Sequence, residues 1–219
     1  PSVVAHSDAG NGIGYTGIRI RGTDATRINM TLNGIPYNDA ESQGVFFVNL
    51  PDFSSSANSI QIQRGVGTSS NGTGAFGASI NMSTNDIQDQ AYVELNNSYG
   101  SFNSWKNTLS LGTGLLQDHY TFDARLSRIS SDGFVDRASS NLQSFYVSGA
   151  YLNDRSSLRF NIFSGKEKTY QAWYGVSEDD LKKGNRTINY AGTERPGDPY
   201  DNETDNYTQT HYQLFFSQQ

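Results

Sequence analysis

The chain has 219 residues and a formal net charge of −6, and 35% of its residues are hydrophobic, 12% aromatic and 17% charged. High aromatic content with few charges excludes a disordered chain, and no run of about 18 apolar residues is present to form a membrane-spanning helix. The acidic balance argues against a nucleic-acid partner, and the absence of cysteine excludes disulfide scaffolds and thiolate sites.

Residues 1–86 have the pattern of a compact mixed domain built from short strands. Asn33-Gly34 predicts a tight turn, and Pro36 limits the next segment to an edge strand or a loop. The segment 51–57 has room for at most one helical turn. Three segments alternate polar and apolar residues with a period of two, as strands with one wet face do, at residues 17–22, 27–32 and 59–64.

From residue 87 to residue 219 the alternation becomes longer and more regular. The longest polar stretch spans about residues 166–206, and elsewhere short connections alternate with longer ones. Strands of about ten residues with charges on their polar face are typical of a transmembrane β-barrel. A soluble β-sandwich is the alternative, although its strands are usually shorter. Alternating runs predict five strands and the start of a sixth, at residues 91–99, 105–111, 120–127, 144–151, 158–162 and 211–216.

Residues 12–17, Gly-Ile-Gly-Tyr-Thr-Gly, match the glycine pattern of dinucleotide-binding folds. That pattern needs a strand before it and a helix after it, so that the phosphate meets a helix N-terminus. Here a polar segment precedes the match and the strand-like Ile18-Arg19-Ile20 comes after it. We therefore interpret the match as accidental and the segment as a glycine-rich loop.

Candidate catalytic and metal-binding residues are few. His6, His119 and His211 are far apart and lack metal-ligand spacing, and no serine lies in a Gly-x-Ser-x-Gly elbow. The acidic segment 198–205 offers carboxylates to a cation such as calcium, but it lacks the glycine and the terminal glutamate of an EF-hand loop. The sequence therefore predicts neither an enzyme nor a cofactor or metal site, and it favours a solvated loop at segment 198–205.

Two segments carry a specific resemblance. Residues 18–39 contain a strand ending in Ile-Arg-Gly and a strand ending in Asn-Gly-Ile-Pro. Residues 60–82 contain a strand ending in Arg-Gly, a stretch of small residues and a closing Ile-Asn strand. In this order, and with long alternating strands after them, they resemble the plug domain of TonB-dependent outer-membrane receptors. Two departures are mild, because Asn71-Gly72 replaces Tyr-Gly and Gly77-Ala78 replaces a double glycine.

The resemblance implies a mainly β fold. Residues 1–86 would form a small mixed α/β plug domain, and residues 87–219 the first five to six antiparallel strands of a transmembrane barrel. The stretch at about 166–206 would be a long extracellular loop. Because this family has 22 strands and a closed barrel needs at least about eight, we expect a fragment, with part of the plug and the TonB box upstream of it.

The resemblance also implies roles for particular plug residues. The family holds its plug by arginine–carboxylate contacts, although ordinary exposed arginines are the alternative. Tyr37 is the strongest candidate for ligand contact, because an exposed tyrosine offers a rigid face and a hydroxyl, and packing beneath the loop is the alternative. Candidates for contact with the barrel are Arg21, Arg27 and Arg64. Candidates in the apical loops for ligand contact are Tyr15, Thr23, Arg27, Tyr37, Asn38 and Asp39. Structural plug glycines are Gly22, Gly34, Gly65, Gly72, Gly74 and Gly77.

By the same resemblance, the expected function is binding and import of a scarce ligand across the outer membrane of a Gram-negative bacterium. The expected partners are a TonB–ExbB–ExbD type inner-membrane energy-transducing complex, a metal chelate or other small molecule, and outer-membrane lipid. The second motif is closer to the iron-siderophore and cobalamin branches than to the glycan-importing branch. A glycan-importing receptor and a secreted or surface β-sandwich that binds a ligand are the alternatives.

Overall fold

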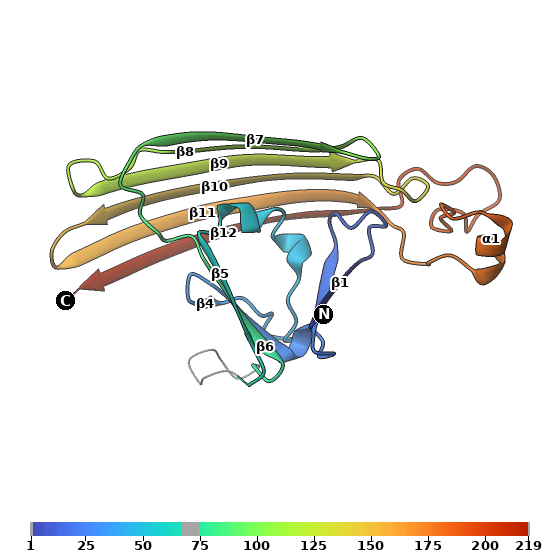
Figure 1. Cartoon of the computed structure of the whole chain (residues 1–219), viewed down its shortest axis with the longest axis horizontal. Helices are drawn as coiled ribbons and strands as arrows, with labels where there is room; N and C mark the ends of the chain where they lie inside the picture. The colour runs from blue at the N-terminus through green and yellow to red at the C-terminus, as the bar shows by residue number, and fades with distance from the viewer. Residues whose placement is uncertain (1, 67–74, 219) are drawn as a thin grey trace.

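The computed structural model describes residues 2–66 and 75–218, and Figure 1 shows a small N-terminal unit lying along one side of a long sheet. The N-terminal unit, which comprises β1 to β6 and their connections, has a β1–β2 hairpin and a four-stranded sheet in the order β4-β3-β6-β5. Its strands are β1 (Val3–Ser7), β2 (Thr16–Ile20), β3 (Ile28–Leu32), β4 (Ile35–Pro36), β5 (Ser59–Arg64) and β6 (Ala78–Ser83). Short 3-10 turns lie at Ala25–Arg27, Phe47–Asn49 and Phe53–Ser56. The last lies in segment 51–57, which has room for at most one helical turn.

The turn between β3 and β4 is determined by its two residues. Asn33 and Gly34 have φ values of 56° and 80°, the left-handed conformation that two-residue hairpin turns require. Leu32 consequently pairs with Ile35, as the sequence predicts. β3 also pairs in parallel with β6 and lies in the interior of the sheet. The core around it contains Ile20, Ile28, Met30, Leu32, Val45, Leu50, Phe53, Ala78 and Ile80.

Six antiparallel strands in sequence order form the long sheet. Each expected alternating run falls on one of them, so their expected number is confirmed. Residues 84–91, around the expected division at residue 86, connect β6 to this sheet. The strands are β7 (Tyr92–Gly100), β8 (Ser104–Gly112), β9 (Tyr120–Ser131), β10 (Ser140–Leu152), β11 (Ser156–Tyr170) and β12 (Thr204–Gln218).

The connection between β11 and β12 is shorter than predicted. β11 continues to Tyr170 and β12 begins at Thr204, so the connection spans residues 171–203 and the expected bounds of 166–206 are wrong. The polar strand ends were mistaken for loop because ladder pairing, as between Lys168 and Asn206, does not require apolar side chains. The connection contains the helix α1 (Glu178–Lys183). No helix in the described part of the chain is long and apolar enough to cross a membrane.

The long sheet exposes apolar side chains on one face and buries polar side chains on the other, which is the reverse of the distribution in a water-soluble protein. On the face turned away from the N-terminal unit, Val93, Leu126 and Phe216 are 77%, 58% and 66% exposed. On the facing side, polar residues such as Thr121 and Asn161 are fully buried. Apolar surface left in water costs about 25 cal/mol per Å², whereas a barrel wall with lipid outside and a wet interior has this distribution.

The N-terminal unit packs on the sheet through the segment around Pro51. The ring of Phe53 lies 4.8 Å from the ring of Phe163 on β11. Two residues further along that strand, a β-carbon at Gly165 would lie 2.7 Å from Cγ of Pro51. Since real β-carbons do not approach other atoms so closely, the glycine is what lets the two units meet here.

We expect Gly165→Ala to destabilise the docking of the N-terminal unit by about 1–3 kcal/mol, because the added carbon overlaps Pro51. Pro51→Ala in the same chain should recover part of this loss, since only Cβ of residue 51, at 3.3 Å, then remains near the new carbon. The measurement is the urea concentration at which a protease begins to cleave the N-terminal unit. Absence of any recovery in the double variant would contradict the overlap.

Candidate functional site between the N-terminal unit and the sheet

A single carboxylate of the N-terminal unit binds two cations of the sheet. Oδ1 of Asp52 lies 2.7 Å from Nζ of Lys106 on β8, and Oδ2 lies 3.1 Å from Nη1 of Arg125 on β9. The hydroxyl of Ser127 also donates to Oδ2. The side chains of Asp52 and Arg125 are only 6% and 4% exposed, so water screens this pair weakly. We name Asp52, Lys106, Arg125 and Ser127 the Asp52 cluster.

Local structure places Asp52 at the sheet. Leu50 and Phe53 on either side of it are buried in the core of the N-terminal unit, which fixes the backbone between them. Asp52 has a φ of 53°, a left-handed conformation that aspartate tolerates better than most residues. The next 3-10 turn brings Ser55 and Ser56 to the same cations, since Nζ of Lys106 donates to Ser55 over 2.7 Å and Nε of Arg125 donates to Ser56 over 2.6 Å.

The surroundings of Asp52 favour its ionised form. Burial alone would raise the pKa of this carboxyl, but hydrogen bonds from Lys106, Ser127 and Ser55, together with the charge of Lys106, outweigh it and hold the pKa below its ordinary value of 3.8. The cluster is therefore a charged, hydrogen-bonded contact at neutral pH.

Hydrogen bonds at two turns also hold the N-terminal unit. At the β3–β4 turn, Nδ2 of Asn33 donates to Oε1 of Gln213 on β12 over 2.8 Å. At the tip of the β1–β2 hairpin, Nδ2 of Asn11 donates to the carbonyl of Ala138 and to Oγ of Ser140, both over 2.9 Å. The amide of Ala172 also donates to the carbonyl of Asp8, over 3.1 Å. The hairpin thus contacts β10, the β9–β10 connection and the β11–β12 connection.

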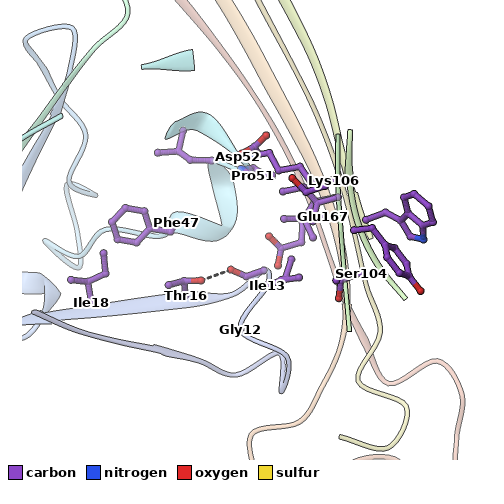
Figure 2. Close-up of a pocket in the computed structure, with 18 residues that line it drawn as sticks. Gly12, Ile13, Thr16, Ile18, Phe47, Pro51, Asp52, Ser104, Lys106 and Glu167 are labelled. Atoms are coloured by element: carbon purple, nitrogen blue, oxygen red, sulfur yellow. Dashed lines mark hydrogen bonds and ion pairs between the residues drawn. The ribbon is translucent and has the colours of Figure 1, made fainter. Parts of the chain in front are cut away.

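A cavity of about 550 Å³ lies between the hairpin tip, the Pro51 segment and the sheet. Figure 2 shows its lining, with apolar groups such as Ile13, Ile18 and Phe47 on the side of the N-terminal unit. Charged groups are at its edges, where Lys106 of the Asp52 cluster and Glu167 of β11 contribute. Glu167 is 1% exposed, and its Oε1 has no hydrogen-bond partner. The volume and the mixture of apolar walls with few polar groups are typical of small-molecule sites.

The three arginines expected to contact the barrel lie elsewhere in the described structure. Nη1 of Arg64 donates to Oγ of Ser2 over 2.9 Å, and the guanidinium of Arg27 lies 6.0 Å from the ring centre of Phe76. Arg21 is exposed and has a φ of 52°. In the described residues, the ion pairs between the two units have the opposite polarity, with the carboxylate on the N-terminal unit. Contact of these arginines with a barrel stays a prediction.

The residues expected to bind ligand do not form one group. Tyr37 packs against the core with its ring 5.6 Å from His211 of β12, and burial raises its pKa. Asn38 bonds the backbone of β3 and of its own loop, accepting from the amide of Met30 and donating to the carbonyls of Ile28 and Gln43. Asp39 accepts from the amide of Ser42. These contacts are structural, and ligand binding by these residues stays a prediction.

The other expected residues are also dispersed. Tyr15 is half-buried beside Asp8 near the hairpin tip. Thr23 donates to the carbonyl of Ile20 over 2.7 Å. Its side chain also fills the space that a β-carbon at Gly77 would need. Gly22, Gly34 and Gly65 have φ values of 82°, 80° and 90°, and the expected Gly72 and Gly74 lie outside the described residues.

Residues 171–203 form a folded connection beyond the end of the sheet (Figure 1). Tyr170 anchors it, because its hydroxyl donates to the carbonyls of Tyr200 and Ala191. Asn189 is buried and donates to the carbonyls of Asp136 and Gln171 over 3.0 and 2.9 Å. Within the residues that the structure describes, no three acidic or histidine side chains gather to hold a metal, the acidic segment 198–205 included.

Sequence reasoning missed the Asp52 cluster and Glu167. A signal for the cluster was present, since Lys106 and Arg125 occupy the polar face of predicted strands and need counter-charges. Asp52, between the apolar Leu50 and Phe53, is a carboxylate of the N-terminal half that packing would bury. Nothing in the sequence indicates which of several acids makes the contact, because the pairing joins residues more than 50 positions apart.

Comparison with known proteins gives the class of this fold. Residues 1–79 match the model of the TonB-dependent Receptor Plug Domain family. No curated protein matches the sequence significantly. Among solved structures, the chain is similar to the ferripyoverdine receptor of Pseudomonas aeruginosa, with 16% identity and a TM-score of 0.60 over 80% of this chain and 23% of that one.

Two other structures have the same fold. The ferric yersiniabactin uptake receptor FyuA of Yersinia pestis is 14% identical with a TM-score of 0.69, over 100% of this chain and 38% of the receptor. The copper transporter OprC is 14% identical with a TM-score of 0.63, over 77% of this chain and 27% of the transporter. The chain therefore spans well under two thirds of the length of the proteins it resembles.

These matches define the N-terminal unit as a plug domain and the long sheet as part of a barrel wall. Residues 1–79 match the TonB-dependent receptor plug family, and the chain as a whole shares the fold of the plug and adjoining wall of these outer-membrane receptors. A soluble β-sandwich is excluded by the same observations, because the six long strands form one sheet that the plug covers on its polar face.

We expect Asp52→Asn to weaken docking of the plug by about 3–5 kcal/mol, because it leaves the buried Arg125 without its counter-charge. Lys182→Gln is the matched control, since it breaks an exposed pair with Glu178 and should cost at most about 0.5 kcal/mol. The measurement is protease cleavage of the plug in increasing urea. Equal effects of the two substitutions would contradict a structural role for the Asp52 cluster.

The lowered pKa of Asp52 also predicts how docking depends on pH. Since the pKa is lower in the folded than in the unfolded protein, the contribution is fully present above the ordinary value of 3.8 and is lost as the pH falls through the lower folded value. Plug docking should therefore be unchanged by this group from neutral pH down to about pH 5 and weaken below about pH 4. The Asp52→Asn variant should lack this acid-dependent step in the same protease assay.

Proposed function

We propose that this chain belongs to a receptor that binds a metal chelate at the loop end of its barrel and imports it into the periplasm. An iron-siderophore is the first ligand class to test, and copper the second, because a copper transporter shares the fold. Residues 1–86 act as the plug and residues 87–219 as the beginning of the barrel. The observation that carries the proposal is a plug-family domain docked on the polar face of a sheet whose other face is apolar and exposed.

The proposed route of energy is a TonB–ExbB–ExbD type complex that acts on the plug from the periplasm. A plug that moves must leave the wall without breaking a large apolar interface. The Asp52 cluster supports this requirement, because charged side chains that leave one another can be solvated in a wet barrel interior. The ligand is proposed to enter near the cavity beside Glu167, since Oε1 of this carboxylate has no hydrogen-bond partner and can accept a hydrogen bond from a ligand.

Ligand identity can be tested by uptake. The complete protein is expressed in a Gram-negative strain that lacks its own receptors, and radiolabelled iron is offered as chelates of different chemical classes. We expect at least one iron chelate to be taken up, and uptake to stop when the energy-transducing complex is deleted. Accumulation of copper or of a glycan in place of every iron chelate would contradict the siderophore assignment.

Plug movement can be tested with a reversible crosslink. A β-carbon at Gly165 would lie 3.3 Å from Cβ of Pro51, close to the spacing of about 3.5–4.5 Å found in disulfides. We expect the oxidised Pro51→Cys, Gly165→Cys double variant to bind ligand but not to import it, and a reductant to restore import. The native chain has no cysteine, so Pro51→Cys alone, treated with the same oxidant, is the control, whereas Gly165→Cys alone would add a β-carbon that overlaps Pro51. Full import by the crosslinked protein would contradict movement of the plug away from β11.

A further inference from the structure

Charged side chains on the six strands of the wall are sorted by face. Alternation along the strands and their register place all four carboxylates, Glu94, Asp123, Glu167 and Asp205, on the plug-facing side. Within the described strands, the charged residues on the outward face are all basic. They are Arg128 on β9 and Lys166 and Lys168 on β11.

The outward cations lie close together. Gln143 on β10 pairs with Arg128 on one side and with Lys166 on the other, so the three residues share one level across neighbouring strands. Two strand spacings separate the cations by about 10 Å. No described carboxylate forms an ion pair with Arg128 or Lys166. Lys168, one outward position nearer the loop end, donates to Asn202 over 3.4 Å.

Arg128, Gln143 and Lys166 lie at the edge of a band of apolar side chains on the outward face. One outward position nearer the turn end, Leu126 and Phe145 pair with each other, and the outward face stays mainly apolar to Tyr120 and Tyr151, whose rings are 5.2 Å apart. The six residue steps from Tyr120 to Leu126 cover about 20 Å along the strand, comparable with the apolar band of about 25 Å on membrane barrels. The cations therefore lie where lipid headgroups begin at the loop end.

The wall is hollowed at this boundary. A hollow of about 540 Å³ has apolar side chains on its turn-end side, among them Leu109, Leu126 and Phe145. Its loop-end side is formed by Arg128, Gln143 and Lys166. An acyl chain fits the first group, and an anionic headgroup with several acceptor oxygens fits the second, because arginine binds phosphate with two parallel hydrogen bonds.

We propose that this outward hollow binds a phosphorylated lipid of the outer leaflet, with a phosphate between Arg128 and Lys166 and an acyl chain against Leu126 and Phe145. The proposal rests on the outward face lying in the membrane and is independent of the ligand that the receptor imports. A basic residue near a membrane surface attracts anionic lipid by an amount equivalent to roughly fivefold in affinity.

The test is native mass spectrometry of the complete protein in detergent, titrated with diphosphorylated lipid A and, separately, with phosphatidylcholine. Arg128→Gln and Lys166→Gln should each weaken lipid A binding roughly fivefold, and the double variant about 25-fold. Binding of phosphatidylcholine should not change. Arg155→Gln is the matched control, since it removes the same charge from an exposed turn at the opposite end of the sheet.

A second substitution protects the test against misfolding. Gln143→Glu keeps the side-chain size but places a negative charge between the two cations, and it should also weaken lipid A binding. Unchanged binding in these variants, or an equal loss in Arg155→Gln, would overturn the proposal. Displacement of lipid A by excess inorganic phosphate would overturn it too, because the hollow would then bind free phosphate rather than a lipid. Transport is measured separately, as uptake of the imported ligand by whole cells that express each variant.

Discussion

The carboxylate of Asp52 is the contact on which the joining of the two units depends. The wall turns most of its large apolar side chains outward, and Tyr146 and Phe163 are the wall residues that join the buried core of the plug, where the ring of Phe163 contacts Phe53. The remaining attraction must come from charges and hydrogen bonds. Asp52 supplies it by satisfying Lys106 and Arg125 together, and without it Arg125 would be a buried charge with no partner.

A polar interface of this kind fixes the orientation of the plug and also allows the plug to separate from the wall. Hydrogen bonds fix distances and angles, so the Asp52 cluster, Asn33 with Gln213 and Asn11 with Ser140 place the plug in one orientation. Each group can also be solvated when it separates, because the barrel interior is wet. Close packing of Pro51 against Gly165 also makes the two surfaces complementary in shape, over a small area. The plug is consequently held in place by contacts that water can replace.

The sequence was sufficient for the elements but not for the contacts between them. Period-two alternation predicts the strands because each strand has one apolar and one polar face, and Asn33-Gly34 predicts its turn because few pairs tolerate two positive φ values. It fails at residues 166–170 and 204–206, where the strands continue with polar side chains on both faces. The expected Arg27 and Arg64 are in local contacts, whereas Asp52 takes the interface. Long-range pairing of charges depends on packing that one sequence does not display.

The β1–β2 hairpin gives the plug a mechanical property. Val3 pairs with Ile20 at the open end of the hairpin, and the tip lies at the far end, bound through Asn11 to Ser140. Tension applied to the chain at Val3 therefore loads the pairs of the hairpin one after another, as when a zipper is opened, before it reaches the tip. The Asp52 cluster lies later in the chain and is loaded afterwards. Resistance is thus divided into small successive steps instead of one simultaneous rupture.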